Sequence, residues 1–288
     1  MTGLCFDIDD TLYSRRELLL RAARDTLGDR AALYGKPGMP EEDRFMEVFY
    51  FYSDESLPRV LAGEMTPYES NVERYMNTIR HLGGKADRED GIAFADRYTY
   101  LLNHITLSGE LEVTLQKLSS CDQLRLGVLT NGLRERQMKK FDLLGLARYI
   151  DRNYVLTTGE IGVSKPERGA FDAIRERFGL APENMWMIGD SLRTDIEGAK
   201  ACGWHTLWLC RDGRVPDDAR TARADMIAQS EEEMCRMLCG LADCRVYIIP
   251  DMIGEQRKRR NRVRHDAYRV KHAVRRAHKT YGNRRNTS

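Results

Sequence analysis

The sequence lacks any apolar run approaching the roughly 18 residues that a membrane-spanning helix requires. Its first residues also lack a basic segment followed by an apolar one, so we expect no secretory signal. Hydrophobic residues make up 42% of the 288 residues and charged residues 31%, proportions that suit a globular chain with a sizeable core. We therefore expect a cytoplasmic protein without a transmembrane segment.

The chain also lacks the cysteine spacing of a structural zinc site. Its seven cysteines are scattered and odd in number, and none forms a paired C-x₂-C motif. We interpret Cys235, Cys239 and Cys244 as helix and core positions, and we expect reduced thiols rather than disulfides.

Charge is distributed unevenly, although the net charge is only +2. Residues 255–288 contain 13 Lys and Arg against 2 Asp and Glu, whereas residues 1–254 carry a net charge of −9. Apolar residues recur in this basic tail at helical spacing, so we expect either a weakly amphipathic helix or disorder. Its charge suits contact with a polyanion such as a nucleic acid. The sequence leaves the role of the tail and the oligomeric state open.

An apolar stretch followed directly by acids lies near the start of the chain. Leu4, Phe6 and Ile8 predict a strand buried on both faces of a parallel sheet. Side chains alternate along a strand, so we expect Asp7 and Asp9 to point to the same side where it ends. Two carboxylates that close repel each other unless a cation or a shared proton lies between them. The pattern therefore indicates a functional site.

The second half of the chain alternates between predicted strands and helices. Strands are predicted over residues 124–129, 154–156, 185–188 and 205–209. Such alternation with short loops is typical of a doubly wound parallel sheet, the Rossmann-like α/β class. Ligands of these sheets bind beyond the carboxyl ends of the strands, where the polar motifs of this chain also fall.

Four of these motifs follow one another in a recognisable order. They are Asp7-Ile8-Asp9-Asp10-Thr11, a strand ending in Thr130, Lys165 before a proline, and a Gly-Asp-Ser-x-x-x-Asp motif from Gly189 to Asp195. Together they resemble the four motifs of the haloacid dehalogenase (HAD) superfamily, of which the first is D-x-D-x-[T/V]. The resemblance implies a Rossmann-like catalytic core.

The resemblance also implies a division into domains. The core covers residues 1–13 and 107–229, and the helical insert at residues 14–106 is similar to the C1 cap of subfamily I. Residues 230–254 form the last part of the core or a linker, and residues 255–288 form the basic extension. Five aromatic residues of the insert, between positions 45 and 52, are either helix core or contacts to the leaving group of a substrate.

Carboxylates of the motifs suit phosphoryl transfer. Asp7 is ionised at neutral pH and is the expected nucleophile, which forms an aspartyl-phosphate. Asp9 is expected to donate a proton to the leaving group and later to accept one from water. Mg²⁺ prefers octahedral oxygen coordination, which the carboxylates of Asp7 and Asp190 and the backbone carbonyl of Asp9 would help to supply.

The remaining motif residues are expected to bind the phosphate. The hydroxyl of Thr130 and the amides of Asn131 and Gly132 are candidate donors. Lys165 supplies the fixed positive charge that phosphoryl transfer needs. Asp195 is expected to orient Lys165 or a metal-bound water, or else to be an ordinary acid in the first turn of a helix.

Differences between this chain and members of the superfamily indicate which reaction we expect it to catalyse. Dehalogenase members lack an acid at the position of Asp9, so its presence favours phosphoryl chemistry. The sugar-phosphate mutases carry Gly-Val where this chain has Asp10 and Thr11, which favours hydrolysis. We therefore predict a Mg²⁺-dependent phosphatase for a small phosphomonoester such as a nucleotide or sugar phosphate. The alternatives are a phosphomutase and a polyanion-binding protein with a vestigial HAD core.

Overall fold

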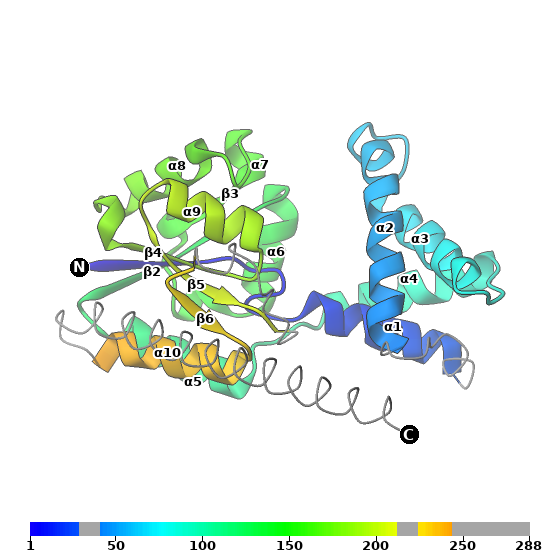
Figure 1. The fold of residues 1–288 in the computed structure, drawn as a ribbon, viewed down its shortest axis with the longest axis horizontal. Coiled ribbons are helices and arrows are strands. Elements are labelled where there is room, and N and C mark those ends of the chain that lie inside the picture. Colours follow the sequence, from blue (N-terminus) through cyan, green and yellow to red (C-terminus); the bar gives the residue numbers. More distant parts are fainter. Residues whose placement is uncertain (29–40, 212–223, 244–288) are drawn as a thin grey trace, which may run out of the picture.

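The computed structural model describes residues 1–28, 41–211 and 224–243. These residues form an α/β core and a helical cap (Figure 1). The predicted basic helix at residues 255–288 and the end of the predicted segment 230–254 lie outside the described residues.

The core contains a six-stranded parallel sheet with the strand order β3-β2-β1-β4-β5-β6. Its strands are β1 (Thr2–Phe6), β2 (Leu124–Thr130), β3 (Val155–Thr157), β4 (Met185–Gly189), β5 (His205–Leu209) and β6 (Met226–Ala228). Central β1 pairs with β2 and β4, so that Leu4 lies between Leu126 and Trp186. The predicted Rossmann-like α/β class is confirmed. Strand β6 was not predicted from the sequence.

Helices cover both faces of the sheet. The helices are α5 (Gly109–Ser119), α6 (Arg134–Leu143), α7 (Thr158–Ile161), α8 (Arg168–Phe178), α9 (Gly198–Ala201) and α10 (Glu231–Asp243). Leu4 and Phe6 pack with residues of α5, α6 and α10 on one face, whereas Cys5 packs with residues of α8 and α9 on the other. Figure 1 shows α5 and α10 together on one side of the strands and α8 and α9 on the opposite side. This alternation is what a strand buried on both faces requires.

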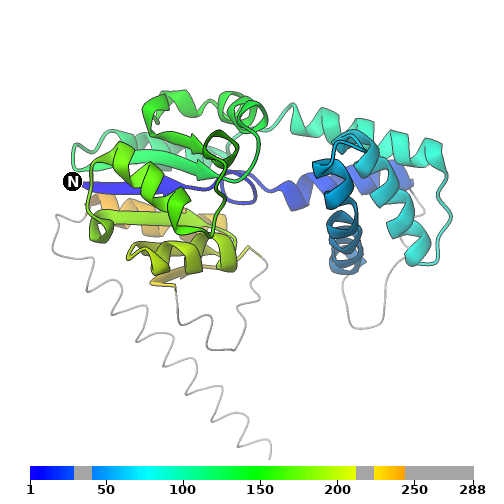
Figure 2. The same cartoon turned by 90° about the horizontal axis from the view of Figure 1, so that it is seen from above.

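The cap is formed by four helices between β1 and α5. They are α1 (Arg15–Leu27), α2 (Glu41–Leu61), α3 (Pro67–His81) and α4 (Arg88–Leu102). They enclose a second hydrophobic core in which the rings of Tyr75 and Phe94 stack 4.5 Å apart and Phe49 contacts Phe94 edge-on. Seen from above, the cap lies at the opposite end of the molecule from the N-terminus (Figure 2).

The aromatic residues around position 50 divide between the two interpretations offered by the sequence. Phe45 and Phe49 are buried in the core of the cap, whereas Phe51 is exposed. Tyr50 instead lines a cavity that also contains Asp190.

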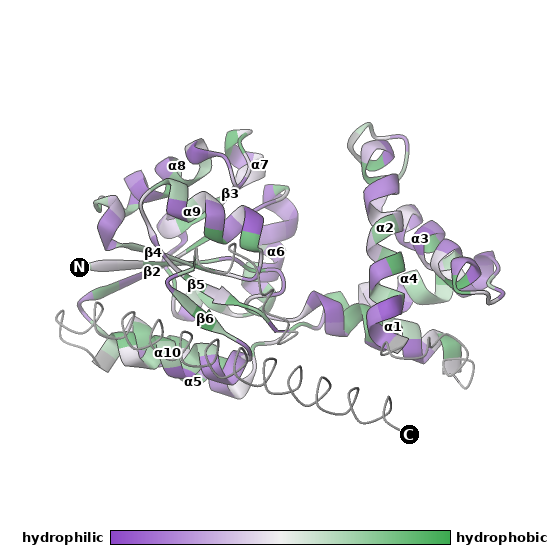
Figure 3. Cartoon of the chain, in the orientation of Figure 1, coloured by the Kyte–Doolittle hydropathy of each residue, from purple (hydrophilic) through white to green (hydrophobic). Residues whose placement is uncertain are grey.

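The cap helices carry both hydrophilic and hydrophobic residues along their lengths (Figure 3). No helix among the described residues is long and apolar enough to cross a membrane.

Candidate active site

Three carboxylates meet at the carboxyl ends of the two central strands. Asp7 directly follows β1, and its amide extends the sheet by donating to the carbonyl of Ile188 at 2.9 Å. Asp190 directly follows β4. Asp195 lies in a six-residue π-helix, Leu192–Glu197. Ligand atoms of Asp7, Asp190 and Asp195 all lie within 4.8 Å of one another.

Lys165 is held between two of these acids. Its buried ammonium donates to Asp7 Oδ1 at 2.7 Å, to Asp195 Oδ1 at 2.7 Å and to the carbonyl of Leu129 at 2.9 Å. An ammonium group has three donors, and all three are therefore used. Burial lowers the pKa of Lys165, but Asp195 and Asp7 outweigh this and raise it above its ordinary value, so the side chain stays cationic.

Asp7, Asp190 and Asp195 together carry more negative charge than Lys165 balances when all three are ionised. Burial raises the pKa of Asp7 to about 7, an effect that Lys165 opposes and that Asp195 and Asp9 reinforce. Burial and the charges of Asp7 and Asp195 raise the pKa of Asp190 to about 8. A cluster of hard oxygen donors with this excess of negative charge is chemically suited to a divalent cation. These three acids are therefore the residues that could hold a metal.

Asp9 lies beside a different lysine. Lys140, on α6, places its ammonium 2.7 Å from both carboxylate oxygens of Asp9. Tyr13 Oη also donates to Asp9, and Gln137 Nε2 donates to it at 3.2 Å. Strand β1 ends at Phe6, and a turn begins at Ile8, whose carbonyl accepts from the amides of Thr11 and Leu12. Asp7 and Asp9 have separate cationic partners, Lys165 and Lys140. That the two carboxylates point to the same side stays a prediction.

The turn after β1 is held in an unusual conformation. Asp10 has a φ of 59°, the left-handed region that residues other than glycine seldom adopt. Arg211 donates to the carbonyls of Asp10 and Thr11 at 2.9 and 2.8 Å, and it also pairs with Glu231 at 2.8 Å. The C-terminal part of the core thus fixes the segment that carries Asp9 and leads into the cap.

The predicted phosphate-binding residues lie together at the end of β2. Thr130 is buried there. The side chain of Asn131 accepts from the amide of Lys165 at 2.9 Å and donates to the carbonyl of Lys165 at 3.1 Å, so it fixes the lysine loop. The amide of Gly132 donates to Thr158 Oγ1 at 3.1 Å. That amide is therefore occupied in this arrangement, and a phosphate would have to displace the threonine hydroxyl to reach it.

Sequence reasoning did not find Tyr13, Gln137, Lys140 or Arg211. Gln137 and Lys140 lie three positions apart on α6, so they share a helix face, but this spacing is equally common on solvated helices. Arg211 follows β5 in a stretch that contains no recognisable motif. Their importance is visible only from what they contact.

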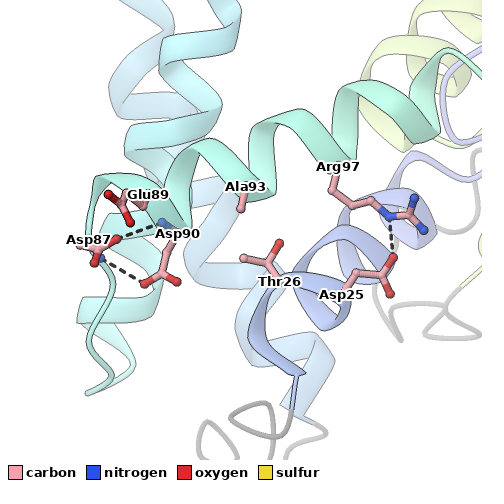
Figure 4. Close-up of a pocket in the computed structure, with 7 residues that line it drawn as sticks. All are labelled: Asp25, Thr26, Asp87, Glu89, Asp90, Ala93 and Arg97. Carbon is pink, nitrogen blue, oxygen red and sulfur yellow. Dashed lines mark hydrogen bonds and ion pairs between the residues drawn. The ribbon is translucent and has the colours of Figure 1, made fainter.

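Two cavities adjoin the site and a third does not. A cavity of about 810 Å³ contains Asp10, Asp190 and Tyr50, and another of about 570 Å³ contains Lys140 together with residues of α2, α3 and α4. The third, of about 430 Å³, lies between α1 and α4 (Figure 4). Three of its four carboxylates have structural partners, since Asp87 and Asp90 cap α4 and Asp25 pairs with Arg97 at 2.6 Å.

Comparison with known families identifies the architecture. A family model for haloacid dehalogenase-like hydrolases matches residues 1–203. The chain belongs to this family. The resemblance predicted from the four motifs is thereby confirmed. Three of the motifs lie at or directly beyond the carboxyl end of a strand, and Lys165 lies in the loop between α7 and α8.

Several curated relatives of this HAD protein are phosphatases. The Methanopyrus kandleri glyceraldehyde 3-phosphate phosphatase is 31% identical over 75% of this chain and 86% of its own length. The Thermus thermophilus phosphoserine phosphatase is 30% identical, with 76% and 92% covered. The Homo sapiens N-acylneuraminate-9-phosphatase is 34% identical, with 73% and 83% covered. The chain is an enzyme of the HAD phosphatase type, and these relatives are phosphoric monoester hydrolases.

Solved structures show the same fold. A dehalogenase with an intermediate complex has a TM-score of 0.60 and 20% identity, with 83% of this chain and 97% of that chain covered. A Bacillus subtilis HAD hydrolase described as bound to magnesium has a TM-score of 0.56 and 22% identity, with 82% and 98% covered. At this level of identity the likeness concerns the fold alone.

Proposed function

We propose that this HAD enzyme hydrolyses a small phosphomonoester, such as a nucleotide or sugar phosphate, with Mg²⁺ and through an aspartyl-phosphate on Asp7. The observation that carries the proposal is the placement of Asp7 against Lys165 at 2.7 Å, beside Asp190 and Asp195, at the carboxyl ends of β1 and β4. The domain boundaries at residues 14 and 106, expected from the motifs, belong to the same proposal.

Asp7 is the nucleophile in this scheme. Its carboxylate attacks the phosphorus, the bond to the leaving oxygen breaks, and the phosphoryl group is transferred to Asp7. Lys165 favours the ionised form of Asp7 and provides a fixed cation beside the transferring group. Asp195 and Asn131 hold Lys165 in place from its side chain and its backbone respectively.

Asp9 is the proton carrier. In the first half-reaction its carboxylic acid protonates the leaving alkoxide, and in the second its carboxylate accepts a proton from the water that hydrolyses the aspartyl-phosphate. The partners of Asp9 favour the ionised form that the second half-reaction needs. Burial raises the pKa of Asp9, but Lys140 and the hydrogen bond from Tyr13 outweigh this and lower it.

The metal and the phosphate have separate ligands in this proposal. Asp7, Asp190 and the backbone carbonyl of Asp9 would hold Mg²⁺, which when bound neutralises charge on the phosphate. The hydroxyl of Thr130 and the amide of Asn131 would donate to phosphate oxygens, and the amide of Gly132 would do so after release from Thr158.

The test is phosphate release from a panel of nucleotides, sugar phosphates and phosphoserine, with Mg²⁺ and with EDTA, for the wild type and Asp7→Asn. We expect Mg²⁺-dependent hydrolysis that Asp7→Asn abolishes. The matched control is Asp122→Asn, which changes an exposed acid before β2 at the opposite edge of the sheet. Hydrolysis that survives Asp7→Asn or EDTA would disprove the mechanism, and the absence of turnover from a folded wild type would disprove the activity.

A further inference from the structure

The cavity between the cap and α6 is strongly cationic. Five basic side chains line it and no Asp or Glu does; they are Arg15, Arg74, Arg136, Lys139 and Lys140. The other polar lining includes Ser56 and Ser70, which share a buried hydrogen bond of 2.8 Å. A cavity of about 570 Å³ is large enough for the polar part of a small metabolite. Asp9 and Asp10 pair with Lys140 and Arg15, and the remaining basic side chains suit an anionic ligand.

Arg74, on α3, is the half-buried member of this group without an ion pair among the described residues, whereas Arg136 and Lys139 are exposed to solvent. Its guanidinium lies 4.2 Å from the centre of the Phe49 ring, and Nη1 donates to Asn71 at 3.2 Å. Its Nε is buried without an acceptor, and among the described residues Arg74 forms no ion pair. Burial, reinforced by the charge of Arg15, lowers the pKa of Arg74 to about 10, so the group is still cationic at neutral pH. A partly buried charge without a partner is costly, and a ligand anion would remove that cost.

The cavity also adjoins the reacting groups. Lys140 lines it and contacts both carboxylate oxygens of Asp9. Arg15 lines it too, and its Nε lies 3.3 Å from Asp10 Oδ2. The leaving group of a phosphomonoester lies next to its proton donor, so a leaving group in contact with Asp9 has its remaining atoms in or beside this cavity.

We propose that the leaving group carries a carboxylate and that Arg74 binds it, which makes Arg74 the residue that selects carboxylate-bearing phosphomonoesters. This inference rests on the proposed function. Nη1 uses one of its donors for Asn71, and Nη2 has no protein acceptor among the described residues. These terminal nitrogens leave donors for the two oxygens of a carboxylate, which guanidinium groups bind in a bidentate manner.

The test compares substrates that differ only in the carboxylate. The pairs are 3-phosphoglycerate with glycerol 3-phosphate, and phosphoserine with phosphoethanolamine. We expect the wild type to favour the carboxylate member of at least one pair by about 10- to 100-fold in kcat/KM, the range for hydrogen bonds to charged groups. Arg74→Met should reduce that ratio to about one, chiefly through KM, and Arg74→Lys should keep part of it, since lysine retains the charge without the fork.

The matched control is Arg59→Met on α2, which removes an exposed ion pair with Glu73 outside the cavity and should keep the wild-type ratio. Turnover of both members of each pair with a ratio of about one would overturn the role of Arg74 and leave the phosphatase intact. Absence of turnover would instead remove the proposed function. Calorimetry would then measure the affinities of the wild type and Arg74→Met for the same pairs. Equal wild-type affinities within each pair would overturn the inference. A wild-type preference for the carboxylate member that is lost in Arg74→Met would support it.

Discussion

The ammonium group of Lys140 lies 2.7 Å from both carboxylate oxygens of Asp9, across 131 positions of sequence. A proton donor is active in its protonated form, whereas this lysine stabilises the ionised form. Asp9 is therefore poised as a base, and it has to share or lose this ion pair before it donates a proton. Lys140 also lines the cavity beside the cap, where a leaving group would compete for its ammonium.

Lys140→Met should shift the pH dependence of the enzyme. Removing the ammonium raises the pKa of Asp9, so the protonated form persists to higher pH, and the basic limb of kcat/KM should move upward. The measurement is kcat/KM between about pH 3 and 9 with glycerol 3-phosphate, because the lowered pKa of Asp9 places the wild-type limb on the acidic side. The control is Lys85→Met, an exposed lysine that lines neither of the two cavities beside the site. An unchanged profile, or the same shift in the control, would contradict this assignment.

The positions of the motif acids were predictable because topology alone determines them. Asp7, Thr130 and Asp190 each end or follow a strand of a parallel sheet, and parallel strands bring their carboxyl ends to one edge. Periodicity and motif order therefore sufficed to place these residues in one site before any contact was known.

Contacts that depend on how elements pack were not predictable in this way. Lys140 and Arg211 have the same local sequence features as many solvated basic residues, and only the packing of α6 and of the segment after β5 brings them to the first motif. The partners of Asp9 could not be predicted for the same reason, because Gln137 and Lys140 reach it from α6.

Asp195→Asn should lower kcat/KM by about 10- to 100-fold, the usual effect of removing a group that orients an active-site residue. Asparagine keeps the shape of the side chain but lacks the negative charge that binds Lys165. In the wild type, Lys165 Nζ lies 2.7 Å from Asp195 Oδ1. The informative measurement is the Mg²⁺ dependence of the rate. A higher half-saturating Mg²⁺ concentration would make Asp195 a metal ligand, whereas a lower kcat alone would make it a positioning residue. Wild-type kinetics would contradict both roles.

Gly189→Ala should displace the carboxylate of Asp195. A Cβ at Gly189 would lie 2.4 Å from Asp195 Oδ2, too close for any real contact, so the carboxylate that holds Lys165 would have to move. We expect a loss of about 1–3 kcal/mol in unfolding free energy together with reduced activity. Gly109→Ala is the control, since it lies at the start of α5 with open space around its Cβ and should stabilise slightly. Equal stability of the two variants would refute the steric argument.

Arg211→Met should loosen the turn that carries Asp9. Two hydrogen bonds to the carbonyls of Asp10 and Thr11 and one ion pair with Glu231 are lost, and we expect a cost of about 2 kcal/mol with lower kcat/KM. Urea unfolding and steady-state kinetics measure the two effects. Arg236→Met, which removes only an exposed pair with Glu232, should change neither by much. Similar losses in both variants would show that Arg211 has no special role in the turn.

Asp225→Asn should destabilise the enzyme in a pH-dependent manner. Burial raises the pKa of Asp225, but the interaction with His205, whose Nδ1 lies 3.8 Å away, and the hydrogen bonds from Lys200 outweigh this and lower it to about 2. A depressed pKa means that the ionised carboxylate stabilises the fold above its unfolded pKa of about 3.9 and that this contribution disappears as pH falls toward 2. We expect the variant to lose roughly 2 kcal/mol at pH 7 and progressively less below about pH 4 in urea unfolding. Asp122→Asn, at an exposed site, should show no such trend, and a difference for Asp225→Asn that stays constant down to pH 3 would contradict the role of its ionised form.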